Sequence, residues 1–415
     1  MELKRALSAI EAALWKIDLA APLNFTTVAR VTGPVSDEAL RAALPKLQAR
    51  HPHLRERIED GHFVEDLELT LELRESAQPW VHEVERELNA HITAPLARFV
   101  RAGDHLLITL HHSIGDGMSG VYLMRDWLRA ATGAELEPLR DPGAVDHLLP
   151  KKPGALGVAR LLASEGVDLV RSGRLLQIKR DEERKAYDRR MRMTPVEIEP
   201  ELVEKLTARA RDESTTLHGA LSAAMALGVL EQAGREKGGL VFGSPANVRG
   251  AVGAGESLGF YVSMLTFRAP VRASTPFWQV ARDVRRAIER HLSAKAELSM
   301  LKLLPIIWDV IGGYHHEPKA IADGWDSLLP ATTGLSNLGR LGIETEYGPL
   351  KLESCHFVAN VSALGEFASM ATSLHGRLFW NFVWPSPVLT DVHAAELIDG
   401  IVNRLIAATS GRAGD

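Results

Sequence analysis

The segment from His105 to Ala130 constrains the fold more than any other part of this sequence. It begins with the apolar run His105–Leu110, continues as His-His-Ser-Ile-Gly-Asp-Gly over residues 111–117, and becomes helix-like from Met118. An apolar β-prone run followed by glycine and aspartate, and then by helical periodicity, predicts a strand, a tight turn and a helix. The two histidines therefore lie at the end of a strand, from which an imidazole can face a cavity.

Strand-like and helix-like segments alternate along all 415 residues, which are too many for one comfortable hydrophobic core. We therefore predict an α/β (α+β) fold in two halves, residues 1–175 and 196–415, joined by a charged crossover over residues 176–195. The basic stretch from Arg171 to Arg190 can be a solvated linker or a docking surface for an acidic carrier protein.

The overall charge excludes some classes of partner. A net charge of −5 and a pI near 6.4 give no general attraction to nucleic acid or to anionic lipid. The single cysteine, Cys355, fits a reducing compartment. Glu2 and Glu11 lie where a signal peptide would be apolar or basic, and no apolar run has the length of a transmembrane helix. We expect a cytoplasmic protein without a nucleic-acid partner or a transmembrane segment.

His112 is the candidate base of this segment. Imidazole has an ordinary pKa near 6.5, so it can accept a proton from a hydroxyl or amine at neutral pH. Asp116 precedes the predicted helix, whose first-turn amides stabilise a carboxylate. Gly117 permits a backbone turn that residues with a Cβ resist.

Other interpretations of the same residues remain open at this point. His112 can be a structural histidine held by backbone groups. A metal site of His111, His112 and Asp116 is disfavoured, because adjacent residues on a strand point to opposite faces. A Ser-His-Asp triad lacks the Gly-x-Ser-x-Gly turn that carries such a nucleophile.

Four ordered motifs resemble those of a known superfamily. The heptad at residues 111–117 resembles the His-His-x-x-x-Asp-Gly motif shared by chloramphenicol acetyltransferase, peptide-synthetase condensation domains and alcohol acyltransferases. Matching stretches occur at Ala43–Arg55, at Phe242–Arg249 followed by Leu258–Leu265, and at Gly334–Arg340. The resemblance therefore covers nearly the whole chain.

Two departures favour one branch of this superfamily. Ser263 stands where condensation domains usually carry asparagine, and the Asp-Phe-Gly-Trp-Gly motif of the plant enzymes is missing. The chain is closest in style to the stand-alone, polyketide-associated acyltransferases, of the phthiocerol dimycocerosyl transferase type.

The resemblance implies a fold and a mechanism. Two chloramphenicol-acetyltransferase-like halves would form a V-shaped pseudo-dimer with a channel between them. His112 would act as general base with His111 in support, and the acceptor would attack the thioester directly, without an acyl-enzyme. Asp116 would orient the loop by pairing with an arginine, for which Arg249 is the candidate. Ser336 and Asn337 would contact the oxyanion or the substrate.

The function implied is that of an acyltransferase in lipid, polyketide or peptide natural-product metabolism. The donor would be an acyl-CoA or a phosphopantetheinyl carrier-protein thioester, and the acceptor a hydroxyl or an amine. No bound cofactor or metal is expected, and one chain carrying both halves implies a monomer. The alternatives are a non-catalytic, carrier-binding module of the same fold and a metal-dependent hydrolase.

Overall fold

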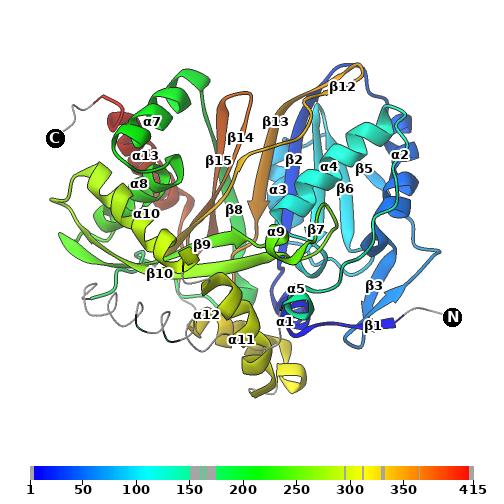
Figure 1. The fold of residues 1–415 in the computed structure, drawn as a ribbon, viewed down its shortest axis with the longest axis horizontal. Coiled ribbons are helices and arrows are strands. Elements are labelled where there is room, and N and C mark those ends of the chain that lie inside the picture. The colour runs from blue at the N-terminus through cyan, green and yellow to red at the C-terminus, as the bar shows by residue number, and fades with distance from the viewer. Residues whose placement is uncertain are drawn as a thin grey trace.

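In the computed structural model, the fold is described for residues 4–149, 159, 163, 174–293, 296–310, 313–328, 332–363 and 365–410. These residues form two six-stranded sheets and one three-stranded sheet with helices packed around them (Figure 1). The predicted α/β fold in two halves is confirmed. The first residues of the basic stretch, from Arg171 to Gly173, lie outside the described residues.

The N-terminal half is built on a sheet with the strand order β12-β13-β2-β7-β6-β5. The strands are β2 (Asn24–Thr32), β5 (Leu73–Ser76), β6 (Ala97–Ala102), β7 (His105–His111), β12 (Glu346–Tyr347) and β13 (Leu350–Ala359). β6 and β7 form an antiparallel pair. Helices α2 (Asp37–Arg50) and α4 (Gly117–Ala131) pack together over the sheet, and α3 (Trp80–Leu88) contacts β2 and β7.

The sheet of the N-terminal half takes two strands, β12 and β13, from the far end of the sequence. β13 pairs antiparallel with β2, from Lys351 opposite Thr32 to Ala359 opposite Phe25. Figure 1 shows β13 beside β2, whereas the next strand along the chain, β14, stands in the other half. Sheet membership therefore departs from the linear division at residue 196, because residues 346–359 complete the N-terminal sheet.

The C-terminal half has the strand order β10-β9-β11-β14-β15-β8. Its strands are β8 (Arg190–Ile198), β9 (Lys237–Asn247), β10 (Val262–Arg272), β11 (Thr333–Arg340), β14 (Ala368–Leu374) and β15 (Arg377–Ser386). Four helices share a buried apolar core with this sheet: α7 (Pro200–Asp212), α8 (Leu217–Gln232), α10 (Phe277–Ser293) and α13 (Asp391–Ala407). The small residues of α8 let it pack against both α10 and α13.

Further elements lie outside the two six-stranded sheets. The three-stranded sheet joins β1 (Lys4–Ala6), β4 (His62–Glu65) and β3 (Glu56–Glu59). Among the described residues, the other α-helices are α1 (Ala9–Ala20), α5 (Val145–Leu148), α9 (Arg249–Val252), α11 (Ala296–Val310) and α12 (Pro318–Leu328), and a 3₁₀ turn, η2, covers His112–Ile114. Among the described helices, none combines the length and the hydrophobicity needed to span a bilayer.

One predicted strand is shorter than expected. The apolar run from Leu258 predicts a strand, but β10 begins only at Val262. Gly259 has a φ of +150°, and a Cβ there would lie 2.5 Å from the Tyr261 ring. Residues 258–261 instead leave the sheet and cross to the N-terminal half. The apolar character of this run reflects burial against the other half.

Candidate active site

His112 lies immediately after β7, as the first residue of η2. The sequence predicts both histidines at the end of the strand, but β7 ends at His111, so His112 lies one residue beyond it. Its side chain is half-buried. The ring lies between Phe25 at 4.9 Å and Phe260 at 5.6 Å, measured between centroids. These two aromatic residues come from different halves and were missed by sequence reasoning.

One hydrogen bond fixes the tautomer of His112. Its Nδ1 lies 3.0 Å from the Gly115 carbonyl oxygen. A carbonyl can only accept, so Nδ1 carries the proton and Nε2 keeps its lone pair. Burial lowers the pKa of His112 to about 4, against the smaller opposing effect of the bond to Gly115. The ring is therefore neutral at pH 7, with Nε2 able to accept a proton.

His111 has the opposite tautomer and a different role. Its Nδ1 accepts from the Ser113 amide at 3.0 Å, and its Nε2 lies 3.6 Å from Asp18. Burial alone would raise the pKa of Asp18, but bonds from His111 and His91 hold it well below its usual range. His111 is thus a buried residue that anchors the turn. No pattern in the sequence marked Asp18 as its partner.

Asp116 is the N-cap of α4 and is almost fully buried, at 1% exposure. Its Oδ1 accepts from the Ser119 amide at 2.8 Å and from the Ser119 hydroxyl at 3.0 Å. Its Oδ2 accepts from the Tyr261 amide at 3.0 Å. The carboxylate therefore caps its own helix and also holds a residue of the other half.

Arg249 meets Asp116 in the structure. Its Nη2 lies 2.7 Å from Asp116 Oδ1 and 2.6 Å from the Ser119 hydroxyl. Its Nη1 donates to the Ser257 carbonyl at 2.7 Å, and the guanidinium stacks 4.9 Å from the Tyr261 ring. The sequence-based pairing of Asp116 with Arg249 thus corresponds to a buried contact between the halves.

Gly117 is required for a reason other than the predicted one. It begins α4, and its φ is not in the left-handed region that only glycine favours. A Cβ at this position would lie 3.0 Å from Leu338 and 3.1 Å from the Phe357 ring. The glycine lets β11 and β13 approach the start of the helix closely. Close packing, and not the backbone conformation expected from the sequence, is therefore the reason for a glycine at this position.

Ser336 and Asn337 lie on β11, whose Leu338 reaches Gly117. Asn337 Oδ1 accepts from the Gly339 amide at 2.8 Å, at a bulge in the pairing with β14. This bond leaves the amide Nδ2 of Asn337 as a donor. Both residues are half-buried.

The three side chains considered for a metal site each make hydrogen bonds within the protein. His111 Nδ1 and His112 Nδ1 are engaged by Ser113 and Gly115, and both oxygens of Asp116 are hydrogen-bonded. Among the described residues, no group of three or more histidine, cysteine or acidic side chains is arranged to hold a metal ion.

Sequence comparisons give a distant relative. No model of a known protein family matches the chain. Bacitracin synthase 2 of Bacillus licheniformis is 26% identical over an alignment of 225 residues that covers 51% of this chain. The matched stretch is 8% of that much longer protein.

Solved structures resemble the chain over nearly its whole length. Polyketide synthase associated protein 5 from Mycobacterium tuberculosis superposes with a TM-score of 0.67 at 13% identity, over 98% of both chains. The trichothecene 15-O-acetyltransferase TRI3 from Fusarium sporotrichioides gives 0.72 at 11%, over 98% of this chain and 96% of its own. The first condensation domain of the calcium-dependent antibiotic synthetase gives 0.72 at 15%, over 99% and 97%. The resemblance inferred from the motifs is confirmed at the level of the fold.

Proposed function

We propose that this protein is an acyltransferase that moves an acyl group from a CoA or carrier-protein thioester to a hydroxyl or amine acceptor. The observation that carries the proposal is the state of His112: a neutral, half-buried imidazole whose Nδ1 proton is held by Gly115, leaving Nε2 free to accept a proton. The shared fold with an acetyltransferase and a condensation domain supports the same reaction class.

The proposed reaction has two steps. The acceptor hydroxyl or amine gives its proton to His112 Nε2 while its oxygen or nitrogen bonds to the thioester carbonyl carbon. The tetrahedral intermediate then collapses, the carbon–sulfur bond breaks, and the imidazolium returns the proton to the leaving sulfur. A base placed in this way contributes roughly 10²–10⁴-fold to the rate. No acyl-enzyme and no resident cofactor enter this route.

The other site residues have supporting roles in the proposal. Asp116 and Arg249 hold the turn that carries His112. His111, whose Nε2 faces Asp18, anchors the same turn. Ser336 or Asn337 would donate to the developing oxyanion. Loss of one such donor typically lowers turnover by ~10²–10³-fold. Because each half contributes contacts to one site, we propose that a single chain is the working unit.

Thioester consumption tests the proposal directly. Acetyl-, octanoyl- and palmitoyl-CoA are each incubated with the protein, with octanol or octylamine as acceptor, and the free thiol is followed with a thiol-reactive dye. We expect thiol release that requires the acceptor, an ester or amide product by mass, and an unchanged mass of the protein. Thiol release without acceptor, accompanied by an acylated protein, would instead indicate a covalent nucleophile and overturn direct attack.

A further inference from the structure

The loop between α9 and β10, residues 253–261, docks onto the N-terminal half along most of its length. The Ser257 hydroxyl donates to the Arg140 carbonyl at 2.9 Å, and the Gly259 carbonyl lies 3.1 Å from the Ser119 hydroxyl, whose one hydrogen it shares with Asp116 Oδ1. The Tyr261 amide donates to Asp116. Leu258 joins the core of the N-terminal half. We call residues 253–261 the docking loop.

Phe260 is the residue of the docking loop that touches the candidate base. Its ring meets the His112 ring edge-on at 5.6 Å, with an interplanar angle of 77°. Its two neighbours are fixed by hydrogen bonds, Gly259 to Ser119 and Tyr261 to Asp116. The position of the Phe260 ring over His112 therefore depends on how the loop is attached.

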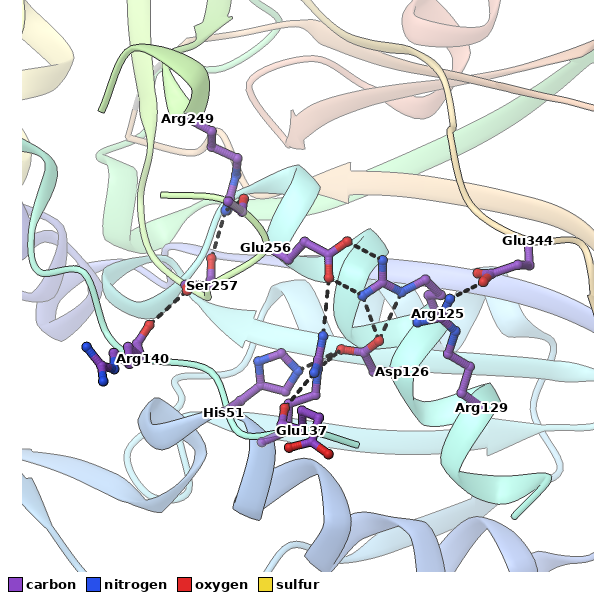
Figure 2. Close-up of polar contacts among 12 residues, drawn as sticks. His51, Arg125, Asp126, Arg129, Glu137, Arg140, Arg249, Glu256, Ser257 and Glu344 are labelled. Carbon is purple, nitrogen blue, oxygen red and sulfur yellow. Dashed lines mark hydrogen bonds and ion pairs between the residues drawn. The ribbon is translucent and has the colours of Figure 1, made fainter. Parts of the chain in front are cut away.

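Glu256, four residues before Phe260 in the docking loop, belongs to a charged cluster, shown in Figure 2. Glu256 Oε1 lies 2.5 Å from Arg125 Nη1, and Glu256 Oε2 lies 2.6 Å from Arg125 Nη2, so the pair is bidentate. Glu256 Oε2 also accepts from Arg50 Nη2 at 3.2 Å. Bidentate arginine–carboxylate pairs are both strong and geometrically specific.

Glu256 completes the charge balance of this cluster. Asp126 is fully buried and accepts from Arg50 Nε at 2.6 Å and from Arg125 Nη2 at 2.8 Å. Burial lowers the pKa of His51, which also contacts Asp126, so this imidazole adds no charge at pH 7. Two guanidinium groups therefore face two carboxylates. Without Glu256, one positive charge in the cluster would be uncompensated.

We propose that Glu256 is a positioning residue for the reaction: by binding Arg125 and Arg50 it holds the docking loop so that Phe260 covers His112. This inference rests on the proposed function of His112. Glu256 contacts neither His112 nor the acceptor in this account, and it acts only through the attachment of the loop.

The effect to be measured is the protonation of His112. The titratable groups that act on its ring are Asp116 at the start of α4, His111 at the end of β7 and Asp18 in α1, together with the bond to the Gly115 carbonyl. None of these contacts Glu256, which lies in the charged cluster with Arg125 and Arg50. A ring uncovered by Phe260 is better hydrated, so its pKa must rise.

The test follows the NMR signal of a His112 ring proton in the substrate-free protein as the pH is varied. The signal is assigned by its absence from the spectrum of His112→Ala. The variants are Glu256→Gln, Phe260→Ala and the double variant. The matched control is Glu289→Gln, which breaks an exposed ion pair with Arg285 within α10. We expect the midpoint of the His112 titration to move to higher pH in Glu256→Gln and in Phe260→Ala, by about one pH unit or more. The control should leave it unchanged, and the double variant should move no further than Phe260→Ala alone.

Two results would overturn the inference. One is an unchanged midpoint in Glu256→Gln. The other is a full additional shift on adding Glu256→Gln to Phe260→Ala, because Glu256 would then act on the pKa of His112 without the Phe260 ring. If Glu256→Gln does not fold, Glu256→Asp, which keeps the charge but shortens the side chain, should give a smaller shift in the same direction. Loss of folding in both would assign Glu256 to global stability and contradict the positioning role.

Failure of this inference and failure of the proposed function are distinguishable. The titration needs no substrate, so it decides the role of Glu256 whether or not acyl transfer is found. Where transfer is measured, the low-pH limb of kcat/KM should move with the NMR midpoint. An inactive His112→Ala together with an unshifted Glu256→Gln would retain the acyltransferase and remove only the positioning role.

Discussion

Arg249 Nη2 lies 2.7 Å from Asp116 Oδ1, although the two residues are 133 positions apart in the sequence. One belongs to the short helix after β9 and the other caps α4, so the contact joins the two halves beside His112. Both side chains are buried, at 5% and 2% exposure. The pair therefore fixes the turn that carries the candidate base relative to the opposite half.

Removal of Asp116 should be strongly destabilising. Asp116→Ala leaves the Arg249 guanidinium buried without its carboxylate and removes the cap of α4, a loss of about 3–5 kcal/mol in the free energy of unfolding. Urea denaturation measures it. Glu231→Ala, which breaks an ion pair with Arg404 at an exposed site, is the control and should cost less than about 1 kcal/mol. Equal losses in both variants would refute a special role for the buried pair.

The pH dependence of transfer should reflect the burial of His112. The base works only when neutral, and burial lowers its pKa to about 4, so kcat/KM should stay flat from pH 7 down to about 5 and fall as the pH passes through about 4. The rate is measured with a saturating acceptor at varied thioester concentration. A limb centred near 6.5, the value for an exposed imidazole, would show that the ring is hydrated.

His356 should make stability depend on pH. It is 1% exposed, its Nδ1 bonds Asn381 at 3.0 Å, and burial lowers its pKa to about 4. Between pH 6.5 and 4, His356 binds a proton in the unfolded chain but stays largely neutral in the folded chain. The free energy of unfolding therefore falls across this window, by roughly 2–3 kcal/mol at its lower end.

The variant His356→Asn isolates this contribution. An asparagine amide can still donate toward Asn381 but does not titrate, so the variant should lose less stability than the wild type between pH 7 and pH 4.5. Denaturant midpoints at the two pH values give the comparison, and His62→Asn, at an exposed position, is the control. Parallel pH dependences in the wild type and His356→Asn would disprove the assignment.

Much of the fold could be predicted because local signals and tertiary structure agree. Ser36 caps α2 by accepting from the Ala39 amide, the β-branched run before Gly33 forms β2, and the turn at Gly103 joins β6 to β7. The transfer of β13 into the other sheet could not be predicted. The alternation of apolar residues in β13 would suit the edge of either sheet. Only the assembled N-terminal sheet shows that β2, paired with β7 on one side, needs a partner on the other side.

The site was predicted where the motif itself carries the chemistry. The sequence identified His112, Asp116 and Arg249 as candidates, and the structure brings the last two together. It did not identify Phe25, Phe260 or Glu256. Phe25 lies in β2 and the other two lie on the docking loop, and the local pattern around such a residue does not indicate a partner far away in the sequence. In the apolar run from Leu258, which predicts a strand, only the residues from Val262 on join β10, and Leu258 packs into the core of the N-terminal half.

The most direct measurement is acceptor-dependent thiol release by the wild type, by His112→Ala and by the surface control His62→Ala, each with circular dichroism to check the fold. The account predicts that His112→Ala keeps the fold and loses transfer by roughly 10²–10⁴-fold, while His62→Ala transfers at the wild-type rate. A folded His112→Ala protein that transfers acyl groups as fast as the wild type would contradict the account.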